Sequence, residues 1–338
     1  MLINEALKLT SDLLRQKLKM ENSIEALSDL STIGIGGPAV IIRVKNEAQL
    51  SQVVNFHAQE GLKLAIIGGG SNLLFPDDGL LATGLILDGD FKRISVRNNY
   101  IEAGAGAATA KILELSQSQA LTGLEFLAGL PGRVGGAVMG NAGAKNHGLA
   151  ELVEEMELIT LQGENLCLKR EEIYPVYRSL NLPESLRGSI IKKVVLALRP
   201  SEADLVAKKI AQERKKRHDS QPSGPSLGCV FKNPPGKSAG QLIDSCGLKG
   251  ETFGGAEISD KHANFIINAK MAKASDVWML ANLARSQVYQ KYQIELFPEI
   301  KIWDLKAQEL SLTQIDYWPG QEPKSQKAKR GQVKTPKI

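Results

Sequence analysis

Five consecutive residues that follow a short apolar run have the types that bind phosphate: Gly68-Gly69-Gly70-Ser71-Asn72. Successive glycines accept positive φ angles, so the backbone can turn several N–H groups toward one point. Such a group of N–H donors binds phosphate oxygens, and the Ser71 hydroxyl and the Asn72 amide add further donors. An ordinary tight loop is the alternative, and three glycines alone do not exclude it.

A second glycine-rich segment favours the phosphate interpretation. Residues 123–148 contain eight glycines, and residues 129–137 and 141–144 have almost no large side chains. Such a stretch packs poorly unless a flat ligand or a phosphate chain lies against its backbone. Two such segments predict a long diphosphate cofactor, a dinucleotide. The candidate cofactor-binding residues are Gly68, Gly69, Gly70, Ser71, Asn72, Gly129, Pro131, Gly132, Gly135, Gly136 and Asn141.

A third segment, Gly104-Ala105-Gly106, is similar to the dinucleotide fingerprint of Rossmann domains. Thr109 stands where the third glycine belongs, and the preceding strand belongs to an expected hairpin rather than to a βαβ unit. We therefore reject a Rossmann domain.

Composition limits the class of protein. The chain has 338 residues, 43% of them hydrophobic and 23% charged, which suits a globular protein of about two domains. Its longest uncharged stretches have 13 residues, fewer than the roughly 20 that a membrane span needs. Residues 1–20 mix charges with leucines, unlike a secretory signal. Three scattered cysteines indicate neither a disulfide framework nor a metal site, so we expect a cytoplasmic protein.

The net charge of +5 comes from the C-terminal tail. Residues 324–338 contain six basic and no acidic residues, and the rest of the chain has 36 basic and 37 acidic residues. A basic tail can bind nucleic acid or anionic lipid, but no aromatic residues interleave these charges. We interpret residues 324–338 as a solvated, disordered end, and we expect neither nucleic-acid nor membrane partners.

Local patterns predict the elements that position these loops. In the first part they indicate amphipathic helices within residues 1–30, a helix capped by Asn46 and ended by Gly61, and a hairpin turning at Asn98-Asn99. The other predicted elements there are strands at 39–44, 64–67, 85–88, 151–161, 165–168 and 190–198 and a helix at 111–119.

A new pattern begins after Pro200. Ser201 is expected to cap a charged helix that reaches Arg217, with Asp204 at the capping-box position. Beyond a loop at 218–228 we predict strands at 229–231, near 257, at 264–268 and at 295–302, and helices at 238–246 and 275–292. The predicted division is an N-terminal helical extension (1–30), a domain with the glycine-rich segments (31–200), a second, α+β domain (201–304) and a C-terminal extension (305–338).

Ten segments, spread over some 270 residues, resemble the UDP-N-acetylenolpyruvoylglucosamine reductases. They are Thr32 with Gly36–Ala39, Gly68–Leu74, Gly123–Gly136, Asn141–Ala144, Tyr177–Ser179, Gly228–Pro234, Ala239–Asp244, Gly247–Gly250, His262–Asn268 and Pro298–Ile300. The resemblance implies an α+β protein with a two-lobed FAD-binding domain of the vanillyl-alcohol oxidase/PCMH type and a smaller substrate domain. It is closer to the shorter subtype, which lacks an extra tyrosine loop.

Three positions depart from the family pattern. Arg133 replaces a small hydroxyl residue and either contacts a cofactor phosphate or points to solvent. The usual Gly-Ala-Tyr-Gly reads Gly143-Ala144-Lys145-Asn146, which leaves a flavin contact of Lys145 open. The usual Tyr-Arg-x-Ser has its serine one place early, so we carry over Arg178 but not Ser179.

The reaction implied by the resemblance reduces an enolpyruvyl ether to a lactyl ether in peptidoglycan precursor synthesis. Hydride passes from NADPH through non-covalent FAD to C3 of the enolpyruvyl group, and a proton must reach C2. Arg178 would pair with the substrate carboxylate, and a protonated Glu299 would offset the charge that develops there. Cys229, where the family often has serine, would donate the C2 proton and is a candidate for alkylation by iodoacetamide.

The remaining candidates have weaker support. Asn233 matches a family contact to the uridine diphosphate, and Lys232 either serves the diphosphate or is solvated. Cys167 and Cys246 are expected to be buried small side chains. His57, His147 and His218 are interpreted as structural or exposed, and His262 as a packing residue of the second domain.

Two other functions compete with this one. An FAD oxidase for an alcohol or sugar often binds its flavin covalently through a histidine, and no histidine here matches such a motif. A non-catalytic flavin sensor would be expected to lose Arg178, Cys229 or Glu299. We expect a monomeric enzyme.

Overall fold

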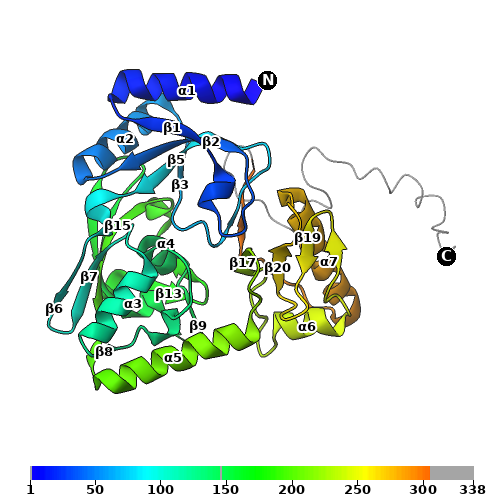
Figure 1. Cartoon of the computed structure of the whole chain (residues 1–338). Coiled ribbons are helices and arrows are strands. Elements are labelled where there is room, and N and C mark those ends of the chain that lie inside the picture. Colours follow the sequence, from blue (N-terminus) through cyan, green and yellow to red (C-terminus); the bar gives the residue numbers. More distant parts are fainter. Residues whose placement is uncertain (1, 145–146, 305–338) are drawn as a thin grey trace.

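The computed structural model describes residues 2–144 and 147–304. Lys145 and the basic tail at residues 324–338, for both of which we made predictions from the sequence, lie outside these ranges. A larger part with two sheets sits beside a smaller part that is built around a third sheet (Figure 1). Short 3-10 turns connect several elements: η1 (Leu27–Leu30), η2 (Gly89–Lys92), η3 (Glu125–Leu127), η4 (Leu149–Leu152), η5 (Arg170–Glu172) and η6 (Glu184–Leu186).

The first lobe is a four-stranded sheet with two helices. Its strand order is β1 (Asn22–Ala26), β2 (Pro38–Val44), β5 (Leu80–Leu87) and β3 (Leu64–Ile66). Strands β2, β5 and β3 run parallel, and β1 is antiparallel to β2. The helices are α1 (Leu2–Leu18), which contacts β1, β2 and β5, and α2 (Glu47–Glu60).

Helix α2 confirms its predicted ends. The Asn46 side chain accepts a hydrogen bond from the Gln49 N–H, and Gly61 follows the helix with φ of 64°. The predicted helical character of residues 22–26 is wrong, because this segment is the edge strand β1. Within residues 2–30 the α-helix is α1, which buries Leu7 and Leu14, and a short 3-10 turn, η1, follows β1.

The second lobe is an antiparallel sheet. Its order is β12 (Asn165–Lys169), β11 (Val153–Ile159), β15 (Ile190–Ala197), β7 (Tyr100–Gly104) and β6 (Ile94–Arg97). The hairpin between β6 and β7 turns at Asn98, whose φ is 56°, as predicted. The helices α3 (Thr109–Ser118) and α4 (Val134–Met139) contact β7.

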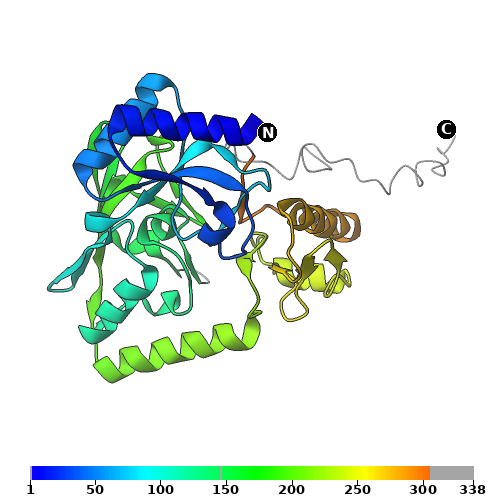
Figure 2. The ribbon, with the colours of Figure 1, turned by 45° about the horizontal axis from the view of Figure 1, so that its top comes forward.

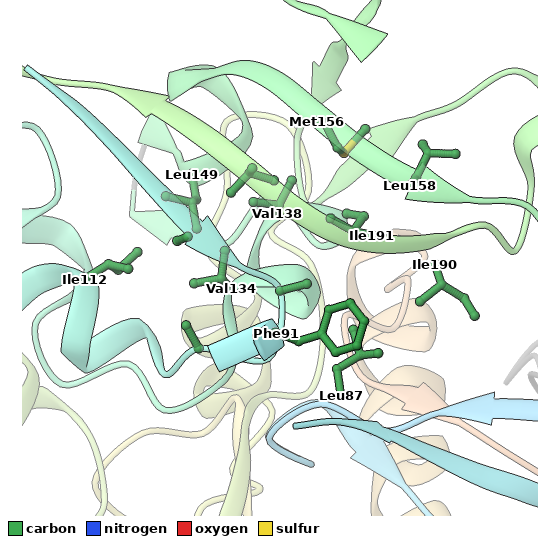
Figure 3. Packing of buried hydrophobic residues seen from close by; sticks show 14 of the residues in the cluster. Leu87, Phe91, Ile112, Val134, Val138, Leu149, Met156, Leu158, Ile190 and Ile191 are labelled. Atoms are coloured by element: carbon green, nitrogen blue, oxygen red, sulfur yellow. The ribbon is translucent and has the colours of Figure 1, made fainter. Parts of the chain in front are cut away.

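Both lobes share one hydrophobic core. It includes Val40 and Leu50 of the first lobe and Met156 of the second. Figure 3 shows Val134 and Val138 of α4 within this cluster, near Leu149 and Met156. The α4 segment, and with it the second glycine-rich segment, is therefore held by the core rather than by surface contacts.

Helix α5 (Ala203–Ser220) packs on the first part, although it was predicted to begin the second. Its Val206 and Ile210 belong to the core of the first part, and it contacts η3, α3 and β8 (Leu121–Thr122). Figure 2 shows it running along one edge toward the smaller part. We therefore propose that the two domains divide after α5.

The predicted start of this helix is also corrected. Glu202, and not Ser201, is the N-cap, and no side chain caps the helix there, so no capping box with Asp204 forms.

The smaller part is an antiparallel sheet in the order β17 (Ser226–Cys229), β20 (Phe265–Asn268), β19 (Ala256–Ile258) and β18 (Thr252–Phe253). Its helices are α6 (Ala239–Ser245) and α7 (Ala274–Tyr292). The fully buried Trp278 of α7 lies in the core of this part.

Two strands of the second part differ from the prediction. The strand expected at 229–231 ends at Cys229, and Phe231 makes only an isolated bridge to Pro298. Most of the segment 295–302 is not a strand. Only β21 (Lys301–Ile302) forms, and it pairs in parallel with β4 (Leu73–Leu74) of the first part.

Four minor pairs complete the described structure: β9 (Gly143–Ala144) with β10 (His147–Gly148), β13 (Tyr174–Val176) with β14 (Ser179–Asn181), β16 (Arg199–Pro200) with β8, and β21 with β4. Hydrogen bonds also join the two parts. The Thr32 hydroxyl donates to the Ser226 carbonyl (2.7 Å), and the Asp77 carboxylate accepts from the Ala274 N–H at the start of α7 (2.8 Å). The second part is therefore fixed against the first lobe.

Candidate active site

The two glycine-rich segments face one another across the lobes. A Cβ atom on Gly69 would lie 2.8 Å from the Gly132 Cα atom, and the Ser71 hydroxyl donates to the Pro131 carbonyl (3.3 Å). Gly70 has φ of 59°, and a Cβ there would meet the Leu30 carbonyl oxygen at 1.8 Å. Gly69 thus lets the two glycine-rich backbones meet closely, and Gly70 lets the first segment pass close to Leu30. Arg133 lies beside Gly68, 3.8 Å from the position of its missing Cβ.

Two asparagines of these segments use their side chains within the protein. Asn141 is buried; its side-chain amide donates to the Val176 carbonyl (2.9 Å), and its oxygen accepts from the Ala150 N–H (3.0 Å). The Asn72 amide donates to the Glu299 carbonyl (3.0 Å). Asn141 therefore holds the β13–β14 hairpin, and Asn72 bonds to the backbone of Glu299.

Arg178 is placed by that hairpin. Val176 and Ser179 pair across it, so Tyr177 and Arg178 form its turn, and Arg178 takes a left-handed conformation with φ of 57°. Its Nη1 donates to the Gly143 carbonyl (2.8 Å). Its Nε lies 2.8 Å from Glu299 Oε1, an ion pair in which the N–H is not aligned as a hydrogen bond. Both side chains are 21% exposed.

The backbone around Glu299 is hydrogen-bonded to the segment that follows Cys229. Its N–H donates to the Val230 carbonyl (2.8 Å), and the Lys232 N–H donates to the Phe297 carbonyl (2.8 Å). Burial raises the pKa of the Glu299 carboxyl, although the charges of Arg178 and Lys232 oppose this. Glu299 thus gains a proton more readily than an exposed glutamate.

Cys229 lies at the end of β17, after a bulge at Gly228, whose φ is 78°. Burial, aided by the negative charge of Glu299, raises the pKa of its thiol to about 12, while Arg178 and Arg217 act in the opposite direction. Glu299 pairs with Arg178, and its N–H donates to the carbonyl of Val230, the residue after Cys229, so the structure brings Arg178, Cys229 and Glu299 together. A thiol with this pKa remains protonated at neutral pH, so the ready alkylation expected from the sequence does not follow.

Arg217 is a site residue that sequence reasoning missed. It lies in the last turn of α5, and its Nη2 donates to the Phe126 carbonyl (2.8 Å). Its buried Nε has no hydrogen-bond partner among the described residues, and burial lowers the pKa of its guanidinium. It follows Lys215 and Lys216 on a charged helix, so its sequence context suggests a solvated side chain. Its place in the site becomes visible only in the structure, where the charges of Arg178 and Cys229 act on it.

The predicted substrate residues lie beside this group. The Asn233 oxygen accepts from the Ala239 N–H at the start of α6 (2.9 Å), and its own N–H donates to the Tyr177 hydroxyl (3.4 Å). Lys232 is half-buried, and its charge acts on Glu299. Asn233 therefore links the second domain to the Arg178 turn.

In the part of the chain that the structure describes, the other cysteines and the histidines contact residues other than Arg178, Cys229 and Glu299. Cys246 packs on the core of the second part, as expected, but Cys167 is exposed on β12 beside Glu155 and Lys169. The expectation that Cys167 is buried is wrong, because its side chain lies on the exposed face of β12, whereas the next residue, Leu168, is buried. The histidines are placed as follows: His57 buried in α2, His147 and His218 exposed, and His262 packed edge-on against Phe265.

Within residues 2–144 and 147–304, no group of three or more His, Cys, Asp and Glu side chains is arranged to hold a metal ion. No helix in the same ranges has the length and apolar surface needed to cross a bilayer.

Comparison with known proteins matches both parts of the chain. Residues 38–168 match the family model of an FAD binding domain, and residues 220–303 match that of the C-terminal domain of UDP-N-acetylenolpyruvoylglucosamine reductase. The second match begins at the end of α5. The matched FAD-binding domain, followed by this second domain, confirms the predicted α+β fold.

Similar whole proteins agree. UDP-N-acetylenolpyruvoylglucosamine reductase 2 of Symbiobacterium thermophilum is 38% identical over 281 residues, which cover 82% of this chain and 91% of that protein. The reductase of Moorella thermoacetica is also 38% identical, over 82% of this chain and 92% of its own length. The crystal structure of the reductase from Thermus caldophilus has a TM-score of 0.74 and 34% identity, covering 84% of this chain and all of that one. The chain therefore belongs to the UDP-N-acetylenolpyruvoylglucosamine reductase family.

Proposed function

We propose that this chain is an NADPH-dependent flavoenzyme that reduces UDP-N-acetylglucosamine enolpyruvate to UDP-N-acetylmuramate in peptidoglycan precursor synthesis. The observation that carries the proposal is the half-buried ion pair of Arg178 and Glu299, with the Glu299 N–H bonded to Val230 next to Cys229, in a chain with an FAD-binding domain. Bound FAD supplies the hydride chemistry between NADPH and the substrate. The protein supplies binding, charge and a proton.

The residues present fit a bound FAD. The backbones meet so closely at Gly69 and Gly132 that a Cβ on Gly69 would lie 2.8 Å from the Gly132 Cα atom, while a Cβ on Gly136 would meet no atom within 4 Å. Backbone N–H groups beside open space suit a phosphate chain and a flat ring. We propose that Gly68–Ser71, Gly129, Pro131, Gly132, Gly135 and Gly136 hold the cofactor.

Arg178 is proposed to bind the carboxylate of the enolpyruvyl group. A guanidinium pairs with a carboxylate through two parallel hydrogen bonds, and this arginine has a buried Nε that lacks an aligned acceptor. Arg217 adds a second buried cation beside it. The fixed positive charge stabilises the negative charge that spreads into this carboxylate as hydride reaches C3.

Substrate binding is proposed to place a proton on Glu299. In the free protein the Arg178 charge favours the ionised form of Glu299, against the effect of burial. An incoming carboxylate pairs with Arg178 and brings a second negative charge near Glu299. Both effects raise the pKa of Glu299 further, so the acid becomes protonated and can donate a hydrogen bond to the substrate carboxylate.

Cys229 is proposed to donate the proton to C2. Its raised pKa keeps the thiol protonated until charge develops at C2, when transfer becomes favourable. Lys232 and Asn233 lie next in the chain and are proposed to contact the uridine diphosphate. Because Arg178, Cys229 and Glu299 come from one chain, we propose a monomer, and we place it in the cytoplasm with its nucleotide-linked substrate.

An anaerobic titration tests this function. The purified yellow holoenzyme should bleach when NADPH is added and regain its colour when the enolpyruvyl sugar nucleotide follows. Recovery of colour with oxygen and an alcohol or sugar, but not with the enolpyruvyl compound, would favour the oxidase alternative.

The flavin is expected to leave the polypeptide on acid or heat denaturation, because no histidine matches a covalent attachment motif. The measurement is the flavin absorbance of the protein-free supernatant compared with that of the precipitate. Flavin that remains on the precipitated chain would contradict non-covalent binding.

A further inference from the structure

We propose that Asn72 is a positioning residue for Glu299, acting through the backbone of that glutamate and not as a ligand of the cofactor. This inference rests on the function proposed above. It gives the last residue of the Gly68–Asn72 loop a role in the second half-reaction, in which the substrate is reduced.

Asn72 bonds to the segment that contains Glu299 at two places, through its side chain to Glu299 and through its backbone to Lys301. The Asn72 side-chain amide donates to the Glu299 carbonyl (3.0 Å), and the Asn72 carbonyl accepts from the Lys301 N–H (2.9 Å). The parallel pairing of β4 with β21 follows at once, with Leu73 opposite Lys301. The Asn72 side chain thus extends a two-residue ladder by one further bond, to the residue that carries the catalytic carboxyl.

The opposite side of Glu299 is held as well. Its N–H donates to the Val230 carbonyl, and Phe231 forms a bridge with the preceding Pro298. The backbone of Glu299 is therefore bonded on one side to the segment after Cys229 and on the other to Asn72. Its carboxylate lies 2.8 Å from Arg178 Nε.

Among residues 2–144 and 147–304, the Asn72 amide is the group of the first lobe that donates to this carbonyl. Without it, the Glu299 carbonyl loses its side-chain donor and the short β4–β21 ladder begins one bond later. Glu299 must keep its carboxyl close to both Arg178 and the substrate carboxylate, and a displacement of about 1 Å can cost about 10²-fold in rate. An asparagine fits here because aspartate would place a negative charge against the carbonyl oxygen.

The test compares both half-reactions in stopped flow, using holoenzyme of the wild type, Asn72→Ala, Glu299→Gln and the double variant. Asn72→Ala should slow flavin re-oxidation by the enolpyruvyl sugar nucleotide about 10- to 100-fold. Its flavin reduction by NADPH and its dissociation constant for FAD should stay within about threefold of wild type. In the double variant the loss should be that of Glu299→Gln alone, since both changes remove one function.

Asn99→Ala is the matched control. The Asn99 amide also donates to a distant carbonyl, that of Leu198, at 3.0 Å, in the hairpin region of the second lobe. Both half-reactions should be unchanged in it. If Asn72→Ala folds poorly, Asn72→Ser serves instead, because its shorter side chain leaves the same carbonyl without its donor.

Three results would overturn the proposal. An FAD dissociation constant raised more than tenfold, with equal loss in both half-reactions, would make Asn72 a cofactor ligand. Additive losses in the double variant would separate it from Glu299, and wild-type rates in Asn72→Ala would show that the bond positions nothing.

A readout without substrate separates this proposal from the proposed function. Amide hydrogen exchange of residues 295–303 should be faster in Asn72→Ala and unchanged in Asn99→Ala, whatever the substrate is. Unchanged exchange in Asn72→Ala would refute the support of Glu299 directly. Failure of the wild type to re-oxidise with the enolpyruvyl compound would instead refute the function.

Discussion

Replacing Cys229 by alanine is expected to slow re-oxidation of the reduced flavin by substrate about 10²–10⁴-fold, the usual contribution of a positioned general acid. The thiol lies among Arg178, Arg217 and Glu299 and stays protonated because burial raises its pKa to about 12. Reduction by NADPH should change little, because no proton is delivered to C2 in that half-reaction. Single-turnover kinetics of the two half-reactions measure both rates.

Cys229→Ser is the matched variant, since a hydroxyl can donate the same proton from nearly the same position. It should keep substantial activity, and Cys246→Ala, which changes a thiol on the core of the second part, should leave the C2 proton transfer intact. A wild-type rate in Cys229→Ala would show that the thiol has only a packing role. The proton would then come from water or another side chain.

Glu299→Gln is expected to leave flavin reduction by NADPH nearly intact and to slow re-oxidation by substrate about 10²–10³-fold, because glutamine keeps a hydrogen-bond donor but has no acidic proton to move toward the developing charge. A carboxylic acid can share its proton with the substrate carboxylate as charge grows there, whereas an amide cannot. Equal loss in both half-reactions would indicate a structural role for Glu299 instead.

The pH profile gives the same residue a second signature. Burial raises the pKa of Glu299, and the protonated form is the active one, so re-oxidation should slow as pH rises through that raised pKa. Glutamine does not titrate, and this decline should be absent in Glu299→Gln. A decline that persists in the variant would belong to another group.

Elements set by neighbouring residues were predictable from the sequence. Asn46 and Gly61 define the two ends of α2, and the hairpin at Asn98 turns where two asparagines stand. Such features depend on bonds that a residue makes within a few positions of itself. The family motifs likewise identified Arg178, Cys229 and Glu299 as the candidate group, and Cys229 in place of serine is visible in the sequence alone.

Features set by distant partners were not predictable. Residues 22–26 became a strand because β2 offers a sheet edge, and α5 joined the first domain because Val206 and Ile210 fit its core. These outcomes depend on surfaces formed by remote segments, and tertiary packing overrides the local pattern.

The site shows the same division. Sequence types indicated what Arg178, Cys229 and Glu299 could do, but only the fold decided that Arg217 joins them and that Asn72 is bonded to Glu299 across 227 positions of sequence. The pKa shifts of Glu299 and Cys229 also belong to the fold, because burial removes water that a sequence pattern cannot place. The sequence by itself determined which chemical groups are available, and the tertiary structure decided which of them meet and in what state of protonation.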